Sequence, residues 1–75
     1  MSLKPLNALA PGDTAVIKEF TDNARLQSRL VEMGVLPGLQ VRMIKKTPFH
    51  GPLEIKIRSY HLSLRWQDAC QILVS

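Results

Sequence analysis

The middle of the chain contains the run Arg29-Leu30-Val31-Glu32-Met33-Gly34-Val35-Leu36-Pro37-Gly38, in which a helical pattern stops and a turn begins. Gly34 is placed to end a helix in the left-handed conformation, because glycine has no Cβ to oppose a positive φ. Val35 or Leu36 would fold back as the hydrophobic contact that accompanies such an ending. Leu36-Pro37-Gly38 predicts a tight turn, since proline fixes one φ and glycine allows the next to be positive.

Upstream of that run, the apolar residues follow a helical period. Leu26, Leu30 and Met33 recur at i, i+4 and i+7, which places them on one face of a helix. We therefore predict an α-helix over about residues 23–33. Its charged residues fall on the remaining surface: Arg25, Arg29 and Glu32.

Before the helix, Thr14 to Phe20 is rich in Val, Ile, Thr and Phe, and Pro11-Gly12-Asp13 precedes it as a turn. Its alternation is imperfect, which is typical of a strand covered on both sides or of one at a barrel corner. Thr21 or Asp22 could then cap the helix through a side-chain oxygen.

Beyond the Pro-Gly turn, three runs alternate between apolar and polar residues, as strands with one buried and one wet face do. They cover Leu39 to Thr47, Leu53 to Arg58 and Tyr60 to Arg65. A loop over Pro48–Pro52 joins the first two, and Ser59-Tyr60 forms a tight link to the third.

The last residues predict a single helical turn that starts at Asp68 and runs through Ala69 and Cys70, followed by a short strand over Ile72 to Val74. These elements together indicate a mainly β domain over residues 1–75: a small antiparallel sheet of about five strands with one inserted helix. In so short a chain such a sheet is expected to curl into a barrel, since closure removes exposed edges. The helix would plug one open end.

Size and composition narrow the functional classes. The 75 residues are too few for a two-domain cleft enzyme, and 45% hydrophobic with 21% charged residues is typical of a globular domain. Ten basic minus six acidic residues give a net charge of +4, which fits a soluble domain with scattered charges. Cys70 is the single cysteine and predicts a reducing compartment. With no apolar run near ~20 residues and no signal-peptide pattern, we expect a cytoplasmic protein.

No catalytic or metal-binding arrangement stands out. His50, His61 and Cys70 show no zinc-site spacing, and the isolated glycines form no phosphate-binding loop. The carboxylates are dispersed along turns, caps and solvent faces: Asp13, Glu19, Asp22, Glu32, Glu54 and Asp68. We therefore predict neither an enzyme nor a cofactor.

A basic sheet face is the basis of one rival interpretation, a small nucleic-acid-binding barrel. Its members would be Arg42, Lys45, Lys46, Lys56, Arg58 and Arg65. Such platforms stack bases on aromatic side chains. The aromatic residues here are sparse and do not alternate with the cations on one strand, and Glu54 interrupts the patch. A solvated sheet face is the favoured interpretation.

A protein-interaction module is the remaining class. Phe49 lies in a proline-flanked loop and Trp66 follows Arg65, and large groups of this kind often anchor interfaces. Two arrangements are open for them. They could stay at the surface, or Trp66 could cover the barrel end while Phe49 packs under its own loop.

The order of these segments resembles the FeoA family. The resemblance rests on Leu6 to Asp13, on the Arg29 to Gly38 run with its RL-x-E-M-G-x-x-P-G pattern, and on Leu62-Ser63-Leu64-Arg65 before Asp68 to Ile72. It covers essentially the whole chain. One departure is the Pro48 to Leu53 loop, where Phe49-His50 replaces the smaller residues often seen in the family.

The resemblance implies an SH3-like β-barrel and a non-enzymatic accessory protein of bacterial ferrous iron uptake. It implies as partner the cytoplasmic region of FeoB, a membrane permease. The same module resembles the SH3-like domain of iron-dependent repressors of the DtxR type, which is a second possible ancestry. It transfers no catalytic or metal residues. Because we expect them to be exposed, we expect these residues to contact the partner: Arg25, Arg29, Leu36, Pro37, Gly38 and Phe49.

Overall fold

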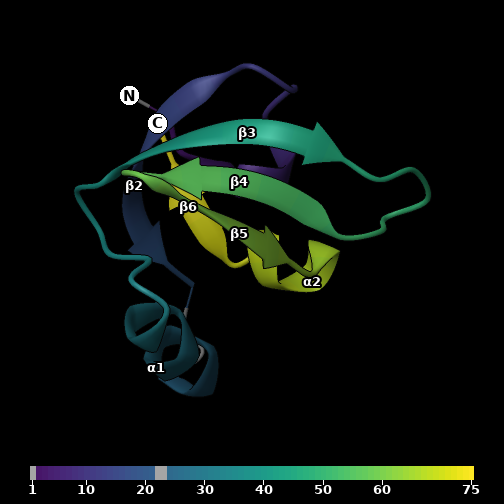
Figure 1. The fold of residues 1–75 in the computed structure, drawn as a ribbon. Coiled ribbons are helices and arrows are strands. Elements are labelled where there is room, and N and C mark those ends of the chain that lie inside the picture. Colours follow the sequence, from purple (N-terminus) through teal and green to yellow (C-terminus); the bar gives the residue numbers. More distant parts are fainter. Residues whose placement is uncertain (1, 22–23) are drawn as a thin grey trace.

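The computed structural model describes residues 2–21 and 24–75, whose strands form one curled antiparallel sheet (Figure 1). In spatial order the strands are β1 (Lys4–Pro5), β6 (Ile72–Val74), β2 (Thr14–Phe20), β3 (Gln40–Lys46), β4 (Leu53–Ile57) and β5 (Tyr60–Leu64). This confirms the predicted mainly β, antiparallel architecture. The sheet has six strands rather than about five, because the two residues of β1 pair with β6. Two residues are too few to show an alternating pattern.

Two of the predicted strands, over Thr14–Phe20 and Ile72–Val74, have the expected bounds. The link between β4 and β5 does not. Ile57 pairs with Tyr60, so the hairpin turn is Arg58-Ser59 and not Ser59-Tyr60. Arg58 has a φ of 56°, and a positive φ at the first central residue is what two-residue hairpin turns require. Arginine is not a usual turn residue, so nothing in the sequence marked this position.

The inward side chains of the strands build the core. The fully buried residues alternate along β3 and β4 and are joined by side chains from the other elements: Leu6, Ile17, Leu30, Val35, Val41, Met43, Leu53, Ile55, Ile57, Ala69, Ile72 and Val74. The period-two pattern thus assigned the faces of these strands correctly. The 3-10 helix η1 (Leu6–Ala8) brings Leu6 into this core from the chain's N-terminal side.

Helix α1 (Ala24–Glu32) lies at one end of the barrel (Figure 1). It ends as predicted, with Gly34 at φ 87°. The amide of Val35 donates to Leu30 O at 2.8 Å and the amide of Gly34 donates to Val31 O at 3.0 Å. These two bonds form a Schellman ending, and buried Val35 supplies its hydrophobic contact.

The predicted start of α1 is only partly covered. Asp22 as a cap and Asn23 as first helical residue lie outside the described residues. The Thr21 hydroxyl donates to the side-chain oxygen of Gln71. Thr21 therefore links the barrel to the segment before β6.

Helix α2 (Trp66–Ala69) begins two residues before the predicted start at Asp68. Arg65 precedes the helix and makes no side-chain cap hydrogen bond, so no typical capping residue marked the start in the sequence. Trp66 packs against the core, which places the first turn of the helix on the barrel. In the described part of the chain, no helix is long and apolar enough to cross a lipid bilayer.

Candidate protein-interaction surfaces

The six residues expected to contact a partner fall on two separate surfaces. We call the first the helix-turn surface, made of Arg25, Arg29 and Leu36-Pro37-Gly38. The second is the tip of the β3–β4 loop, with Phe49. Figure 1 shows α1 at the lower left and this loop at the far right, so the structure does not bring the two together.

On the helix-turn surface, the turn is held firmly against the barrel. The amide of Leu39 donates to Leu36 O at 3.3 Å, and Gly38 has a φ of 93°, as a type II turn requires. Gly38 also donates to Ile17 O at 2.7 Å, and the amide of Ile17 donates to Leu39 O at 2.9 Å. Leu36 is thus 38% exposed on a rigid support, and Pro37 and Gly38 beside it are exposed. Arg25 and Arg29 are exposed on α1.

The end of α1 is fastened to the edge of the sheet. The hydroxyl of Tyr60, on β5, donates to Met33 O at 2.9 Å. A Cβ on Gly34 would overlap with that hydroxyl, so glycine is needed here for both its φ and its small size. This contact fixes the position of the helix-turn surface relative to the barrel.

The β3–β4 loop presents Phe49 completely to solvent, at a relative exposure of 101%. The alternative in which Phe49 packs under its own loop is therefore wrong. The loop is closed by the amide of Thr47, which donates to Pro52 O at 3.2 Å. Phe49 and His50 have φ values of 61° and 60°, a left-handed conformation that is rare for bulky residues. In this backbone conformation the phenyl ring is carried outward instead of inward.

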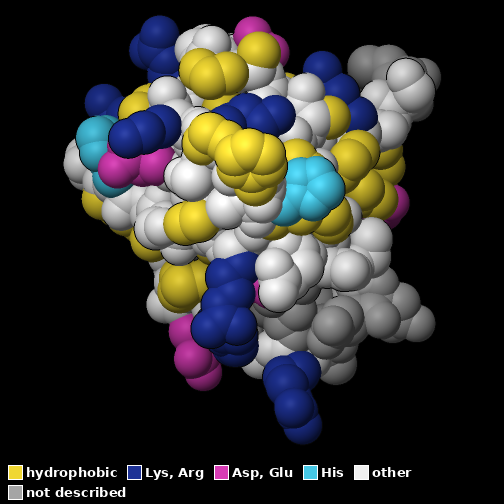
Figure 2. All heavy atoms as spheres, turned by 90° about the vertical axis from the view of Figure 1, so that its right-hand side faces the viewer, with side chains coloured by type: hydrophobic (Ala, Val, Ile, Leu, Met, Phe, Trp, Pro, Cys, Tyr) yellow, Lys and Arg dark blue, Asp and Glu magenta, His cyan; other side chains and the backbone are white. Residues whose placement is uncertain are grey.

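Behind Phe49, the loop is braced by an aromatic stack. The rings of His50 and Trp66 lie 4.4 Å apart between centroids and are tilted by 11°. Lys46 Nζ is 5.7 Å from the Trp66 centroid and donates to Asn7 O at 2.8 Å. Trp66 itself is half-buried against the core, as one of the two predicted arrangements has it. Figure 2 shows hydrophobic side chains gathered beside a histidine on this side of the molecule, with cations around them.

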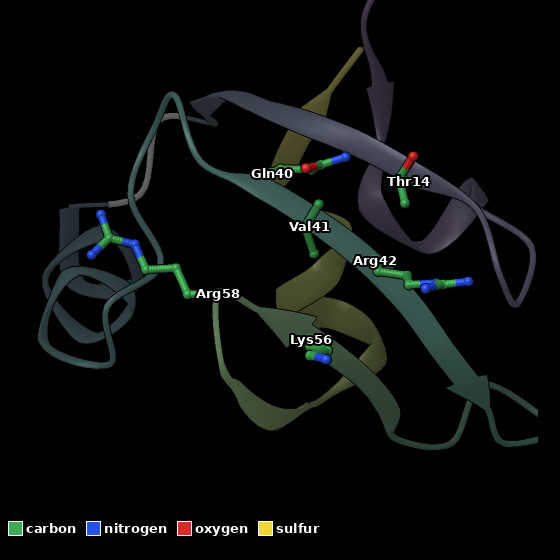
Figure 3. A pocket seen from close by; sticks show the side chains of 6 residues that line it. All are labelled: Thr14, Gln40, Val41, Arg42, Lys56 and Arg58. Atoms are coloured by element: carbon green, nitrogen blue, oxygen red, sulfur yellow. The ribbon is translucent and has the colours of Figure 1, made fainter.

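A third surface is a concavity of about 350 Å³ on the wet side of β2, β3 and β4. It is lined by Thr14, Gln40, Val41, Arg42, Lys56 and Arg58 (Figure 3). Arg42 stands directly opposite Lys56 in the β3–β4 register, and Thr14 stands opposite Arg42. Among the described residues that line it, none is acidic. Part of the expected basic sheet face therefore exists as a cationic concavity.

The histidines and the cysteine each have different neighbours. His61 is exposed on β5, His50 is stacked on Trp66, and Cys70 accepts a hydrogen bond from Asn7 Nδ2 at 2.6 Å. Across residues 2–21 and 24–75 there is no group of three or more His, Cys, Asp or Glu side chains that could hold a metal ion.

The sequence profile of the FeoA domain matches residues 4–75. The chain belongs to the FeoA family. It is 33% identical over 69 residues to the Fe(2+) transport protein A/Fe(2+) transporter FeoB fusion protein of Porphyromonas gingivalis (strain ATCC BAA-308 / W83). That match covers 92% of this chain and only 8% of the fusion protein. The resemblance inferred from the sequence is thereby confirmed, and the family is one of ferrous iron transport.

Solved structures support the SH3-like fold. FeoA of Stenotrophomonas maltophilia complexed with zinc, described as a procaryotic SH3 domain protein, superposes with a TM-score of 0.80 at 28% identity. The match covers 95% of this FeoA chain and 88% of that one. A manganese-dependent transcriptional repressor in complex with manganese reaches a TM-score of 0.91 at 20% identity over 99% of this chain and 36% of its own. At that identity the likeness shows the fold alone, so the repressor-type alternative is matched only in fold.

Sequence reasoning missed some members of these surfaces. It named Arg42, Lys56 and Arg58 but not Thr14 on β2 and Gln40 on β3, which also line the concavity. It also missed the stacking of His50 on Trp66. These two residues are far apart in the chain, and only the fold brings the loop to the start of α2.

Proposed function

We propose that this chain is a non-enzymatic accessory protein of ferrous iron uptake that binds the cytoplasmic region of a FeoB-type permease and supports or regulates transport. The observation that carries the proposal is the Porphyromonas gingivalis relative, in which protein A and FeoB form one fusion protein. Fusion holds two modules at a high effective concentration, which benefits modules that act on each other. In this proposal the chain works in the cytoplasm and needs no cofactor of its own.

Phe49 is the contact that the structure favours most. A fully exposed phenyl ring gains about 1.5–3 kcal/mol when it is transferred from water into an apolar pocket. The left-handed backbone at Phe49 and His50 costs free energy in the isolated chain, and such strain is typical of sites that bind. Because the His50–Trp66 stack supports the loop, little conformational entropy would be lost on docking.

The helix-turn surface supplies a second contact of different character. Leu36 offers a small apolar group on a hydrogen-bonded turn, and Arg25 and Arg29 offer positive charge beside it. We propose that these residues and the Pro37-Gly38 turn meet a separate part of the same partner, because they lie on the opposite side from the loop.

Binding to the purified FeoB cytoplasmic region, measured by interferometry or calorimetry, tests the proposal. Phe49→Ala is expected to weaken binding by about 10–100-fold, the equivalent of the lost burial of one phenyl ring. Leu36→Ala is expected to have a smaller effect, since the side chain is already partly covered. Leu3→Ala is the matched control, because Leu3 is 41% exposed and lies outside both surfaces.

One result would contradict the proposed partnership, and another would contradict only the assignment of Phe49 as its contact. If the intact chain does not bind the FeoB region but binds DNA or RNA in a control titration, the rival nucleic-acid or repressor-type function is favoured. If binding occurs and Phe49→Ala behaves like Leu3→Ala, the partnership stands but the loop is not its contact.

A further inference from the structure

The cationic concavity carries an imbalance of charge that the fold does not require. On the rung of the sheet where Lys45 faces Glu54, opposite charges stand across from each other. On the rung where Arg42 faces Lys56, two positive charges stand across from each other. Like charges directly opposite each other in an antiparallel pair are destabilising. A ligand with negative charge would remove that repulsion.

Arg58 adds a third cation to the same place at a cost to the backbone. It lines the concavity and holds a φ of 56°, although glycine or asparagine would adopt this conformation more readily. A strained residue that also completes a charged surface indicates that its side chain is needed there.

The shape of the surface indicates what kind of anion fits. Figure 3 shows the Arg42 and Arg58 side chains extending in opposite directions, with Lys56 between them, so the charges are spread out. A compact anion would therefore not contact the Arg42 and Arg58 guanidinium groups at the same time. Side chains two apart on a strand are about 7 Å apart, and the same spacing separates alternate side chains of an extended peptide. Lys56 and Arg58 are two residues apart, so alternate carboxylates of such a peptide would match this pair, and Arg42 stands across from Lys56 on β3.

A nucleic acid fits less well, because single-stranded platforms stack bases on aromatic rings. No aromatic side chain is found among the lining residues that the structure describes. Phe49 and Trp66 belong to the loop surface instead.

We propose that the concavity of Thr14, Gln40, Arg42, Lys56 and Arg58 binds an extended acidic segment of a protein. Lys56 and Arg58 would pair with alternate carboxylates, and Arg42 would contact the carboxylate that faces Lys56, since guanidinium groups bind carboxylates in a bidentate manner. Thr14 and Gln40 would donate or accept hydrogen bonds at the rim. This inference does not depend on which protein carries the acidic segment, so it does not rest on the FeoB proposal.

The test is a titration of the ¹⁵N-labelled chain with a peptide that alternates glutamate and serine, followed by amide chemical shifts. We expect the largest shifts in residues 14, 40–42 and 56–58. We also expect binding to weaken strongly as ionic strength rises from about 0.01 M to about 1 M, which shortens the screening length from about 30 Å to about 3 Å. A glutamine–serine peptide serves as the uncharged probe and an oligothymidylate as the polyanionic one.

Two variants of equal net charge separate the site from general attraction. Arg42→Gln, Lys56→Gln and Arg58→Gln together lower the net charge from +4 to +1 (4 − 3 = 1) and should weaken glutamate-peptide binding about tenfold or more. The control combines Lys4→Gln, Lys18→Gln and Arg65→Gln, which are exposed residues outside the concavity, and reaches the same +1. Its binding should fall by much less.

The proposal is overturned if the two variants weaken binding equally, or if the glutamine peptide binds as well as the glutamate peptide. Tighter binding of the oligothymidylate, with shifts at the same amides, would assign the face to nucleic acid instead. Circular dichroism of both variants checks that they are folded. The salt dependence of the unaltered chain provides a test that needs no variant.

Discussion

Replacing Gly34 by alanine tests how α1 is joined to the barrel. Gly34 has a φ of 87°, a left-handed conformation that costs an L-residue about 1–2 kcal/mol. The added Cβ would also overlap with the hydroxyl of Tyr60, the far end of a side chain that is 37% exposed. The ring can turn toward solvent, so this second cost is the lost hydrogen bond to Met33 O, about 0.5–1.5 kcal/mol. Together the two terms predict a loss of about 1.5–3.5 kcal/mol in the free energy of unfolding.

Gly12 provides a matched control. It has a φ of 94°, and a Cβ built on it meets nothing within 4 Å. Gly12→Ala should therefore show only the backbone cost of about 1–2 kcal/mol. The difference between the two substitutions measures the contact with Tyr60.

Urea unfolding gives these free energies, followed by circular dichroism and by the fluorescence of Trp66, the single tryptophan. For a domain of this size, the Gly34→Ala loss corresponds to a fall in Tm of about 6–28 °C. Tyr60→Phe removes the hydroxyl, so in that background Gly34→Ala should cost about 1–2 kcal/mol. If Gly34→Ala is no worse than Gly12→Ala, or costs the same with and without the hydroxyl, the reasoning about Tyr60 is refuted.

Three further substitutions are expected to have measurable effects. Leu30→Ala should cost about 2–5 kcal/mol in urea unfolding because Leu30 is fully buried, whereas Val31→Ala, at a side chain 49% exposed, should change stability by less than about 0.5 kcal/mol; equal effects would show that Leu30 does not seat α1. His50→Ala should shift Trp66 emission to longer wavelength, since it uncovers one face of the indole, and the control His61→Ala should leave the spectrum unchanged; an unshifted His50→Ala spectrum would argue against the stack in solution. Arg58→Gly should raise the free energy of unfolding by about 0.5–1 kcal/mol, because glycine adopts a φ of 56° without strain. The same substitution should weaken binding of the acidic peptide. A loss of stability would contradict the strain at Arg58.

Two exposed residues of this chain are in conformations that cost stability. Phe49 exposes a large apolar ring from a left-handed backbone, and Arg58 combines a left-handed backbone with a place in a cationic surface. Both residues would be replaced in a sequence optimised for stability alone. Each is therefore a more informative target than the glycines, whose conformations the fold itself requires.

Local signals along the chain were enough to predict most of the architecture. The helix ending at Gly34 and the turn at Pro37-Gly38 depend on the φ preferences of single residues, which act whatever the rest of the chain does. The alternation in β3 and β4 predicted the buried faces, because side chains on a strand point to opposite sides in turn. The Arg29 to Gly38 run, which contains that helix ending and that turn, also carried part of the family resemblance.

What the sequence could not determine depends on pairing between distant segments. Strand β1 exists only because Lys4 and Pro5 meet β6, and the Arg58-Ser59 turn follows from the register that pairs Ile57 with Tyr60. Alternation says which face a side chain occupies but not which residue stands opposite it.

The candidate surfaces show the same division. Exposure of Arg42 and Lys56 was predictable from alternation, but their position across from each other was decided by the β3–β4 register. In the same way, Phe49 was recognisable as a loop residue. Its complete exposure was decided by the left-handed backbone of the loop and by the Trp66 ring that braces its neighbour His50. Sequence therefore determined the elements and their faces, because those depend on neighbouring residues, whereas tertiary structure decided which side chains meet, because that depends on long-range packing.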